Sequence, residues 1–465
     1  MALVTTFASA PLTMYFYPPW YQKKVEAWRR GEIDWDTGKP IDGNDSVQDG
    51  IHFDKVAAEK VKRVTVYLRL DSMPNLLAFT ALFGGSQKPE PKIHPSIAAN
   101  STVEKGESST EDITPNRPVE AYGLRLLNLT DRGSSVMQVS EMESYTAYDP
   151  VVNTFRTFGH LHNLAVSGES LVVPESSFAD TLATRASDSN LLLIPWSETG
   201  VMSEQAIIED KGTKNKLAAS QYIAFVNATF DAATSPVAVL INKNFGGSKN
   251  KDRRPNLKLS RTYSSVSLHT DQAVTAPIAD RSHHIFFAFF GGADDRAALR
   301  LVLQLVDNPQ TTATLVHFEI PDAFLGSSTA STSSGPMPGK AGETIITTTA
   351  PSTREQDAAF FASLRASLPA ELANRVVFET VTSDQPIKDV IARASIEVGQ
   401  SPKNAGDLVV LGRNIGRNNA LGAENPDEIR SASSASSTLG VLAEKVWESK
   451  LGASVLVIKA GAATG

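Results

Sequence analysis

HIFFAFFGGADDRAALRLVLQLVDNPQTTATLVHFE, residues 284–319, is the stretch that decides the fold of this chain. It begins and ends with apolar runs of strand length, and between them apolar residues recur at helical spacing. Asp294 and Asp295 fall in the first turn of the predicted helix, where the helix dipole favours acidic side chains. Strand, helix and strand in this order are typical of a βαβ unit in a parallel sheet.

The same alternation extends in both directions along the chain. Strands are predicted at residues 64–70, 121–128, 170–173, 191–194 and 237–241, and then at 284–290, 313–319, 375–380, 407–411 and 454–458. Helices are predicted at residues 73–83, 151–164, 176–187 and 221–233, and then at 293–306, 354–367, 385–398 and 439–450. This order predicts an α/β fold of two tandem doubly wound, parallel-sheet units. Both units end in similar apolar strands, VAVLI and SVLVI, whose pairing would join them as a pseudo-dimer.

Composition divides the chain into four parts. We expect a membrane-exit segment with a linker at residues 1–61, the two units at 62–245 and 281–465, and a polar linker at 246–280. Three segments rich in polar, small or proline residues are expected to be mobile because they cannot bury a core, namely residues 86–118, 326–353 and 417–436.

Net charge, cysteine content and the composition of the N-terminal residues limit the classes of function that fit this chain. The 465 residues carry a net charge of −7, which gives no electrostatic argument for a nucleic-acid partner. The chain has no cysteine, so disulfides and Cys-ligated metals are excluded. Residues 1–16 are apolar and are followed by aromatic and then basic residues, as where a membrane helix leaves the bilayer on the cytosolic side. A soluble N-terminal arm that packs its aromatic residues on the core is the alternative.

Several blocks of sequence carry a family resemblance. DPVVNTFRTFGHL (149–161), AVSGESLVVPE (165–175) and LLLIPWSETG (191–200) resemble the cytosolic C-terminal half of plant and fungal cation/proton antiporters of the cation:proton antiporter-2 group, and most of all the fungal K+/H+ antiporters. Further blocks resemble that group in the same order, at residues 17–35, 63–85, 122–141, 289–299, 407–414 and 439–459. The repeated unit resembles the Rossmann-like fold of universal stress proteins.

The resemblance implies a role as well as a fold. It implies a cytosolic regulatory domain of a monovalent cation (K+)/proton antiporter, attached to the membrane transport domain of the same polypeptide and forming a homodimer. The location would be the cytosolic face of an intracellular membrane such as the Golgi, or of the plasma membrane. Such a domain would sense an adenine nucleotide, AMP or ATP, and modulate transport without being an enzyme. A free-standing tandem universal stress protein that binds nucleotide is the alternative.

The resemblance places a phosphate-binding turn in the second unit. Gly412, Arg413, Asn414 and Gly416 follow a predicted strand, and Gly440 begins a predicted helix, so backbone N–H groups there would face a phosphate. The glycines are one residue further apart than in the family pattern. The alternative is an ordinary strand exit in which glycine permits a positive φ. We expect Arg413 to lie on an exposed turn.

The first unit keeps another part of the family site. Asp71 and Ser72 end its first strand, where the Asp71 carboxylate would accept a hydrogen bond from a ribose hydroxyl. The alternative is that Asp71 caps the helix beginning near Met73, a common use of Asp or Ser at that position. The eight histidines show no metal-ligand spacing, because His160 and His162 point to different helix faces and His283 and His284 alternate across a strand. The sequence therefore predicts no metal site.

Overall fold

The computed structural model describes residues 60–85, 118–129, 147–198, 200–202, 217, 219–243, 245–246, 280–320, 353–399, 404–414, 434–449 and 451–461. The expected membrane-exit segment and most of the linker at 246–280 lie outside these residues, as do nearly all of the segments expected to be mobile. Within the part of the chain that is described, no helix is long and apolar enough to cross a membrane.

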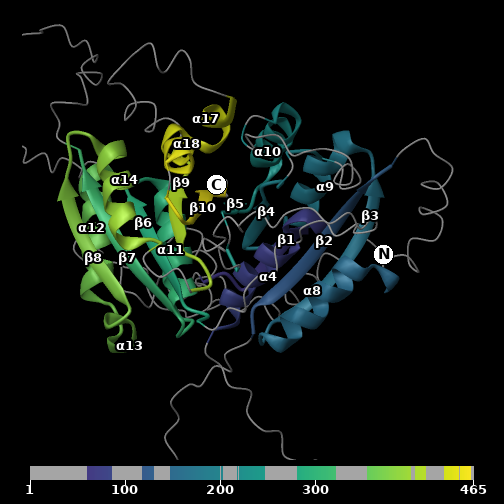
Figure 1. Cartoon of the computed structure of the whole chain (residues 1–465), viewed down its shortest axis with the longest axis horizontal. Coiled ribbons are helices and arrows are strands. Elements are labelled where there is room, and N and C mark those ends of the chain that lie inside the picture. Colours follow the sequence, from purple (N-terminus) through teal and green to yellow (C-terminus); the bar gives the residue numbers. More distant parts are fainter. Residues whose placement is uncertain are drawn as a thin grey trace, which may run out of the picture.

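One ten-stranded sheet passes through both halves of the molecule (Figure 1). Its strands are β1 (Arg63–Leu68), β2 (Glu120–Asn128), β3 (Ala165–Val173), β4 (Leu191–Pro195), β5 (Val237–Ile241), β6 (His283–Phe289), β7 (Thr311–Glu319), β8 (Val376–Thr382), β9 (Leu408–Gly412) and β10 (Ser454–Lys459). The spatial order is β3-β2-β1-β4-β5-β10-β9-β6-β7-β8. Each half thus has its first strand between its second and fourth, the doubly wound order with a switch point between the first and fourth strands.

The strand pairing confirms the predicted α/β class and the predicted junction. Neighbouring strands within each half are parallel. The two halves meet where β5 and β10 pair antiparallel, with Val239 opposite Val457. The predicted pairing of the VAVLI and SVLVI strands is therefore correct.

Helices cover both faces of the sheet (Figure 1). They are α4 (Met73–Ala81), α8 (Pro150–Leu161), α9 (Phe178–Arg185), α10 (Ser220–Ala232), α11 (Ala293–Val306), α12 (Thr353–Ala366), α13 (Ala370–Ala373), α14 (Pro386–Glu397), α17 (Ser434–Leu439) and α18 (Val441–Glu448). Short 3-10 turns occur at Leu70–Ser72, Leu82–Gly84 and Glu175–Ser177.

The C-terminal helix differs from its prediction. In place of one helix at 439–450 there are two, α17 and α18, separated at Gly440, whose φ of 92° suits glycine alone. The end of the segment at 417–436 was expected to be mobile, and that part of the prediction is wrong. Ala435 and Ser436 belong to α17 and are buried, because α17 packs beside α10 and α18.

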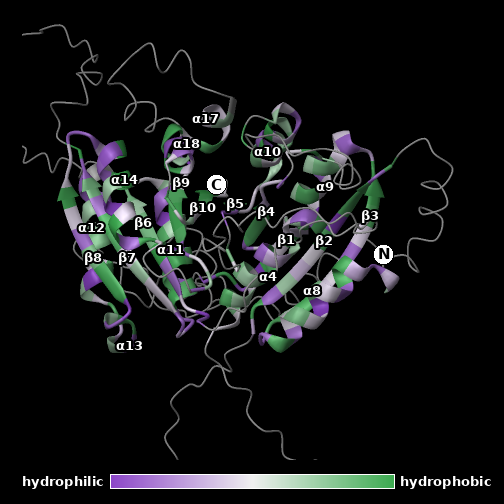
Figure 2. Ribbon diagram, viewed as in Figure 1, coloured by the Kyte–Doolittle hydropathy of each residue, from purple (hydrophilic) through white to green (hydrophobic). Residues whose placement is uncertain are grey.

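Two apolar cores lie on the two faces of the sheet, and each contains residues from both halves. The hydrophobic colouring of strands such as β4 and β9 can be followed in Figure 2. Along β6 the side chains alternate between the two cores: Ile285, Phe287 and Phe289 belong to one core, Phe286 and Ala288 to the other. Because both cores cross the β5–β10 junction, the two halves pack against each other and share their cores. The domain boundaries expected at 62–245 and 281–465 stay a prediction.

Candidate functional site

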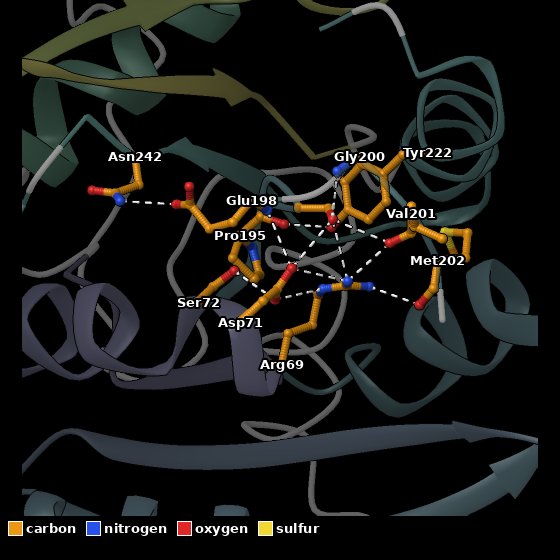
Figure 3. Close-up of polar contacts among 11 residues, drawn as sticks. Arg69, Asp71, Ser72, Pro195, Glu198, Gly200, Val201, Met202, Tyr222 and Asn242 are labelled. Atoms are coloured by element: carbon orange, nitrogen blue, oxygen red, sulfur yellow. Dashed lines mark hydrogen bonds and ion pairs between the residues drawn. The ribbon is translucent and has the colours of Figure 1, made fainter. Parts of the chain in front are cut away.

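The switch point of the first half holds a buried ion pair. Arg69 and Asp71 follow β1, and their side chains are 0% and 3% exposed. The Arg69 guanidinium donates two hydrogen bonds to the Asp71 carboxylate, from Nε to Oδ1 at 3.0 Å and from Nη2 to Oδ2 at 3.1 Å. Arg69 also donates to the carbonyls of Val201, at 2.9 Å, and Met202, at 3.0 Å (Figure 3). The pair therefore fastens the loop after β4 to the end of β1.

Asp71 has further donors around it. Its carboxylate accepts from Ser72 Oγ at 3.0 Å, from Ser197 Oγ at 3.2 Å and from the Glu198 N–H at 3.2 Å (Figure 3). The helix-capping role considered for Asp71 is wrong, because α4 begins after Ser72 with no side-chain cap. The role as a ribose acceptor gains no support, because the enclosed carboxylate leaves a ligand almost no access in this conformation.

Aromatic rings close the rest of this switch point. Trp196 is 1% exposed and lies edge-on to the fully buried Tyr222, with ring centroids 5.3 Å apart. The Tyr222 hydroxyl donates to the Pro195 carbonyl, and the Arg69 guanidinium lies 5.4 Å from the Tyr222 ring centre. Burial alone would raise the pKa of the Asp71 carboxyl, but the Arg69 guanidinium outweighs it and holds that pKa below its usual value. Asp71 is therefore a charged structural group.

The turn after β9 in the second half is also packed. A Cβ on Gly412 would lie 2.0 Å from Oδ1 of Asp295, whose Oδ2 accepts from the Phe290 N–H at 2.8 Å. The Arg413 N–H donates to the Ile458 carbonyl at 2.8 Å, and the Asn414 N–H donates to Asp294 Oδ2 at 2.9 Å. Glycine is needed at position 412 because a buried carboxylate lies against it, and the next two N–H groups already have partners inside the chain.

Arg413 is half-buried at the junction of the halves, which corrects the expectation that it lies on an exposed turn. Its Nε donates to the Thr438 carbonyl at 2.7 Å, and its guanidinium lies 4.2 Å from the centre of the Phe230 ring in α10. Burial lowers the pKa of Arg413, and the carboxylates of Asp231 and Asp294 oppose that shift. Arg413 thus connects α10 of the first half to α17 of the second.

A second cation accompanies Arg413. Lys459, at the end of β10, donates from Nζ to the carbonyl of Phe230. Burial lowers the pKa of Lys459, and the nearby positive charge of Arg413 lowers it further. Two cations thus gather at the C-terminal end of α10, where the helix dipole is negative. The carboxylates of Asp231 and Asp294 lie close to both cations and offset part of this positive charge.

The predicted site residues therefore fall into two separate groups. Gly412, Arg413 and Asn414 lie together at the end of β9, and Arg413 Nε is bonded to Thr438, two residues before Gly440. Gly416 lies outside the described residues. Asp71 and Ser72 lie in the other half. Sequence reasoning did not find Arg69 or Lys459, although RLD at 69–71 sets Arg69 and Asp71 two positions apart at the end of a strand. Among the described residues, no cluster of three or more acidic or histidine side chains could hold a metal ion.

Comparisons with known proteins give a likeness in structure only. No family model and no curated protein matches the sequence. A universal stress protein from Archaeoglobus fulgidus DSM 4304 matches at 11% identity and a TM-score of 0.34, covering 86% of this chain and 96% of its own. The cytoplasmic domain of a prokaryotic cation chloride cotransporter matches at 10% identity and a TM-score of 0.34, covering 86% of this chain and 95% of its own. At these TM-scores the fold assignment rests on the strand order described above.

Proposed function

We propose that this chain is a cytosolic regulatory domain of a monovalent cation/proton antiporter, with K+ as the transported ion, that acts on the membrane transport domain of the same polypeptide. The observation that carries the proposal is the antiparallel β5–β10 junction, which joins two doubly wound halves of identical strand order into one sheet. The sequence resemblance to antiporter tails implies such a tandem, and the resembling blocks lie along both of its halves.

The two cores that both halves share limit how the halves could move relative to each other. Because both cores cross the junction, the halves move together unless the junction itself rearranges. A regulatory ligand alters transport only if it binds two arrangements of the domain with different affinity. The proposed signal is therefore a change at the junction of the halves, passed to the transport domains of a homodimer.

We place the proposed nucleotide, AMP or ATP, at the second half. Arg413 and Lys459 supply positive charge there, and α18 begins at Gly440, where unpaired helix N–H groups favour an anion. The phosphates would contact the Arg413 guanidinium and the first turn of α18, because the N–H groups of Arg413 and Asn414 are already bonded. The domain would bind the nucleotide without hydrolysing it.

Replacement of Arg413 by alanine tests this placement. We expect the affinity for AMP and ATP to fall by about 10- to 100-fold, the loss typical of a hydrogen bond to a charged group. Calorimetric titration measures it, with Asp71→Ala as the comparison in the other half and thermal unfolding without nucleotide as the check on folding. Loss of binding in Asp71→Ala with full binding in Arg413→Ala would move the site to the first half. No heat with any form, or phosphate release from ATP, would contradict nucleotide sensing.

Attachment to a membrane domain is tested separately. An antibody against this chain should detect, in cell fractions, an integral membrane polypeptide much longer than 465 residues. Deleting residues 60–461 from that polypeptide should change K+/H+ exchange in membrane vesicles without removing it from the membrane. A cytosolic polypeptide of the length of this chain would contradict the proposal and support the free-standing tandem stress protein.

A further inference from the structure

The segment that follows β5 crosses from the first half onto the second. Asn242 and Lys243 leave the strand, and the fully buried Phe245 ring stacks on His283 at the start of β6, with centroids 4.6 Å apart and planes 18° apart. The next residue, Gly246, donates its N–H to the Ala405 carbonyl at 2.7 Å. His283 is 7% exposed, so its imidazole lies beneath this segment.

The hydrogen bonds fix the form of the imidazole. Nδ1 of His283 lies 2.7 Å from the Gly406 carbonyl. A carbonyl only accepts, so Nδ1 carries the proton of the neutral ring and any second proton must go to Nε2. The Ala405 N–H, in turn, donates to the Ser282 carbonyl at 3.2 Å. The ring, the 405–406 turn and the Phe245–Gly246 segment are therefore one packed unit.

We propose that His283 is a proton sensor at the junction of the two halves: protonation of its ring loosens Phe245 and Gly246 from the second half. The start of the segment stays attached, because the Lys243 N–H donates to Ser454 Oγ at 2.8 Å and its Nζ to the Trp447 and Ser449 carbonyls. The expected change therefore begins at the Phe245–Gly246 contact.

The charged groups around the His283 ring do not cancel the effect of burial on its pKa. Burial lowers the pKa of His283; the Gly406 carbonyl and the carboxylates of Asp407 and Asp280 oppose it without reversing it. Asp280 is fully exposed, and Asp407 is already bonded to Asn404 Nδ2 at 2.6 Å and to the N–H of His284 at 3.2 Å. Attraction between a protonated ring and Phe245 is worth about 0.5–2 kcal/mol and also opposes the loosening.

The pKa of the neighbouring His284 is shifted in the same direction as that of His283. Its Nδ1 lies 2.9 Å from Thr312 Oγ1, and its Nε2 lies 3.5 Å from the Glu397 carboxylate. Burial lowers its pKa, although Asp407 and Glu397 raise it. Both imidazoles therefore bind protons less readily in the folded chain than in the unfolded one, so the fold loses stability as pH falls below the ordinary histidine value of 6.5.

The contact also communicates with the first half. The Phe245 N–H donates to Asn242 Oδ1 at 2.8 Å, and Asn242 Nδ2 donates to the Glu198 side chain at 2.8 Å. The Glu198 N–H contacts the Asp71 carboxylate at 3.2 Å (Figure 3). Release of Phe245 therefore removes a support of the loop that Arg69 and Asp71 hold closed. Protonation at one half would loosen the switch point of the other.

Amide hydrogen exchange, corrected for the intrinsic pH dependence, tests the proposal on the full chain. Between about pH 7.5 and about pH 5.5, protection of the Gly246 amide should fall by up to about tenfold, because pH 5.5 lies one unit below the ordinary histidine pKa of 6.5. In His283→Gln, whose amide can still donate to Gly406, most of that fall should disappear, and only the contribution of His284 should remain. The matched control is His160→Gln on the exposed face of α8, which should respond as the wild type does.

A ring titration followed by NMR gives an independent readout on the wild-type chain, whether or not the variant folds. The proposal requires His283 to titrate below the ordinary value of 6.5. Titration at or above that value overturns it, as does an equal pH response at Gly246 in wild type and His283→Gln. Nucleotide affinity plays no part in either measurement, so this inference stands or falls apart from the proposed ligand.

Discussion

Arg69→Met should lower the free energy of unfolding by about 3–5 kcal/mol, the loss typical when one partner of a buried ion pair is removed. The carboxylate of Asp71 would stay enclosed at 3% exposure and keep only its bonds to the two serine hydroxyls and the Glu198 N–H. The loop at Val201 and Met202 would also lose its two donors. Urea unfolding at neutral pH measures the loss.

Two comparison variants test whether the loss of stability comes from the buried ion pair and not from the removal of any arginine. Arg63 pairs with Glu120 at 3.0 Å but is 47% exposed, so Arg63→Met should cost no more than about 1 kcal/mol. Adding Asp71→Leu to Arg69→Met should restore part of the stability, because no unpaired charge then remains buried. Equal losses in the Arg63 and Arg69 variants would contradict the structural role given to the pair.

The pH dependence of the same pair follows from the pKa of Asp71. The folded state lowers that pKa, so the unfolded chain binds the proton more readily. The stabilisation is present above the ordinary carboxyl value of 3.8 and is lost as pH falls toward the lower folded value. In Arg69→Met this acid-sensitive contribution should be missing, in contrast to the histidine effect, which acts nearer neutral pH.

The elements of the fold could be predicted because local sequence specifies them. The helix at 293–306 has the bounds expected, since apolar residues recur at helical spacing between Gly292 and Asp307. The junction could be predicted because both halves end in similar apolar strands, VAVLI and SVLVI, and an unpaired strand edge tends to pair with another strand. Their apolar residues on both faces indicate that helices cover the sheet on both sides.

The site could not be predicted in the same way, because its decisive contacts join residues far apart in sequence. The position of Arg413 depends on Phe230, which comes from the other half. The same holds for His283, whose burial depends on Phe245. The position of Asp71 after a strand indicates a cap or a ligand group. Its ion pair with Arg69 forms at the turn Leu70–Ser72, which encloses the carboxylate. Glycine at 412 indicated a close approach, but not that the approaching group is a carboxylate.

A charge at the centre of the junction should have the largest effect of all. Val457 is fully buried on β10 and lies opposite the equally buried Val239 on β5. Val457→Asp would place an unpaired carboxylate in the core that both halves share, at a cost of several kcal/mol out of a total stability of about 5–15 kcal/mol. Because that core crosses the junction, the first half should lose stability together with the second, although the substitution lies in the second.

Hydrogen exchange at amides of β1 and β9 reports on the two halves separately. In Val457→Asp, protection should fall in both strands by the same free energy, as expected when they open only in a common unfolding event. Val377→Asp is the matched control, since Val377 is 53% exposed on the edge strand β8 and the same charge there remains in water. If β9 lost its protection while β1 kept that of the wild type, the halves would be independent domains. In that case a signal could not pass between them through the shared cores, and regulation would have to act through one half alone.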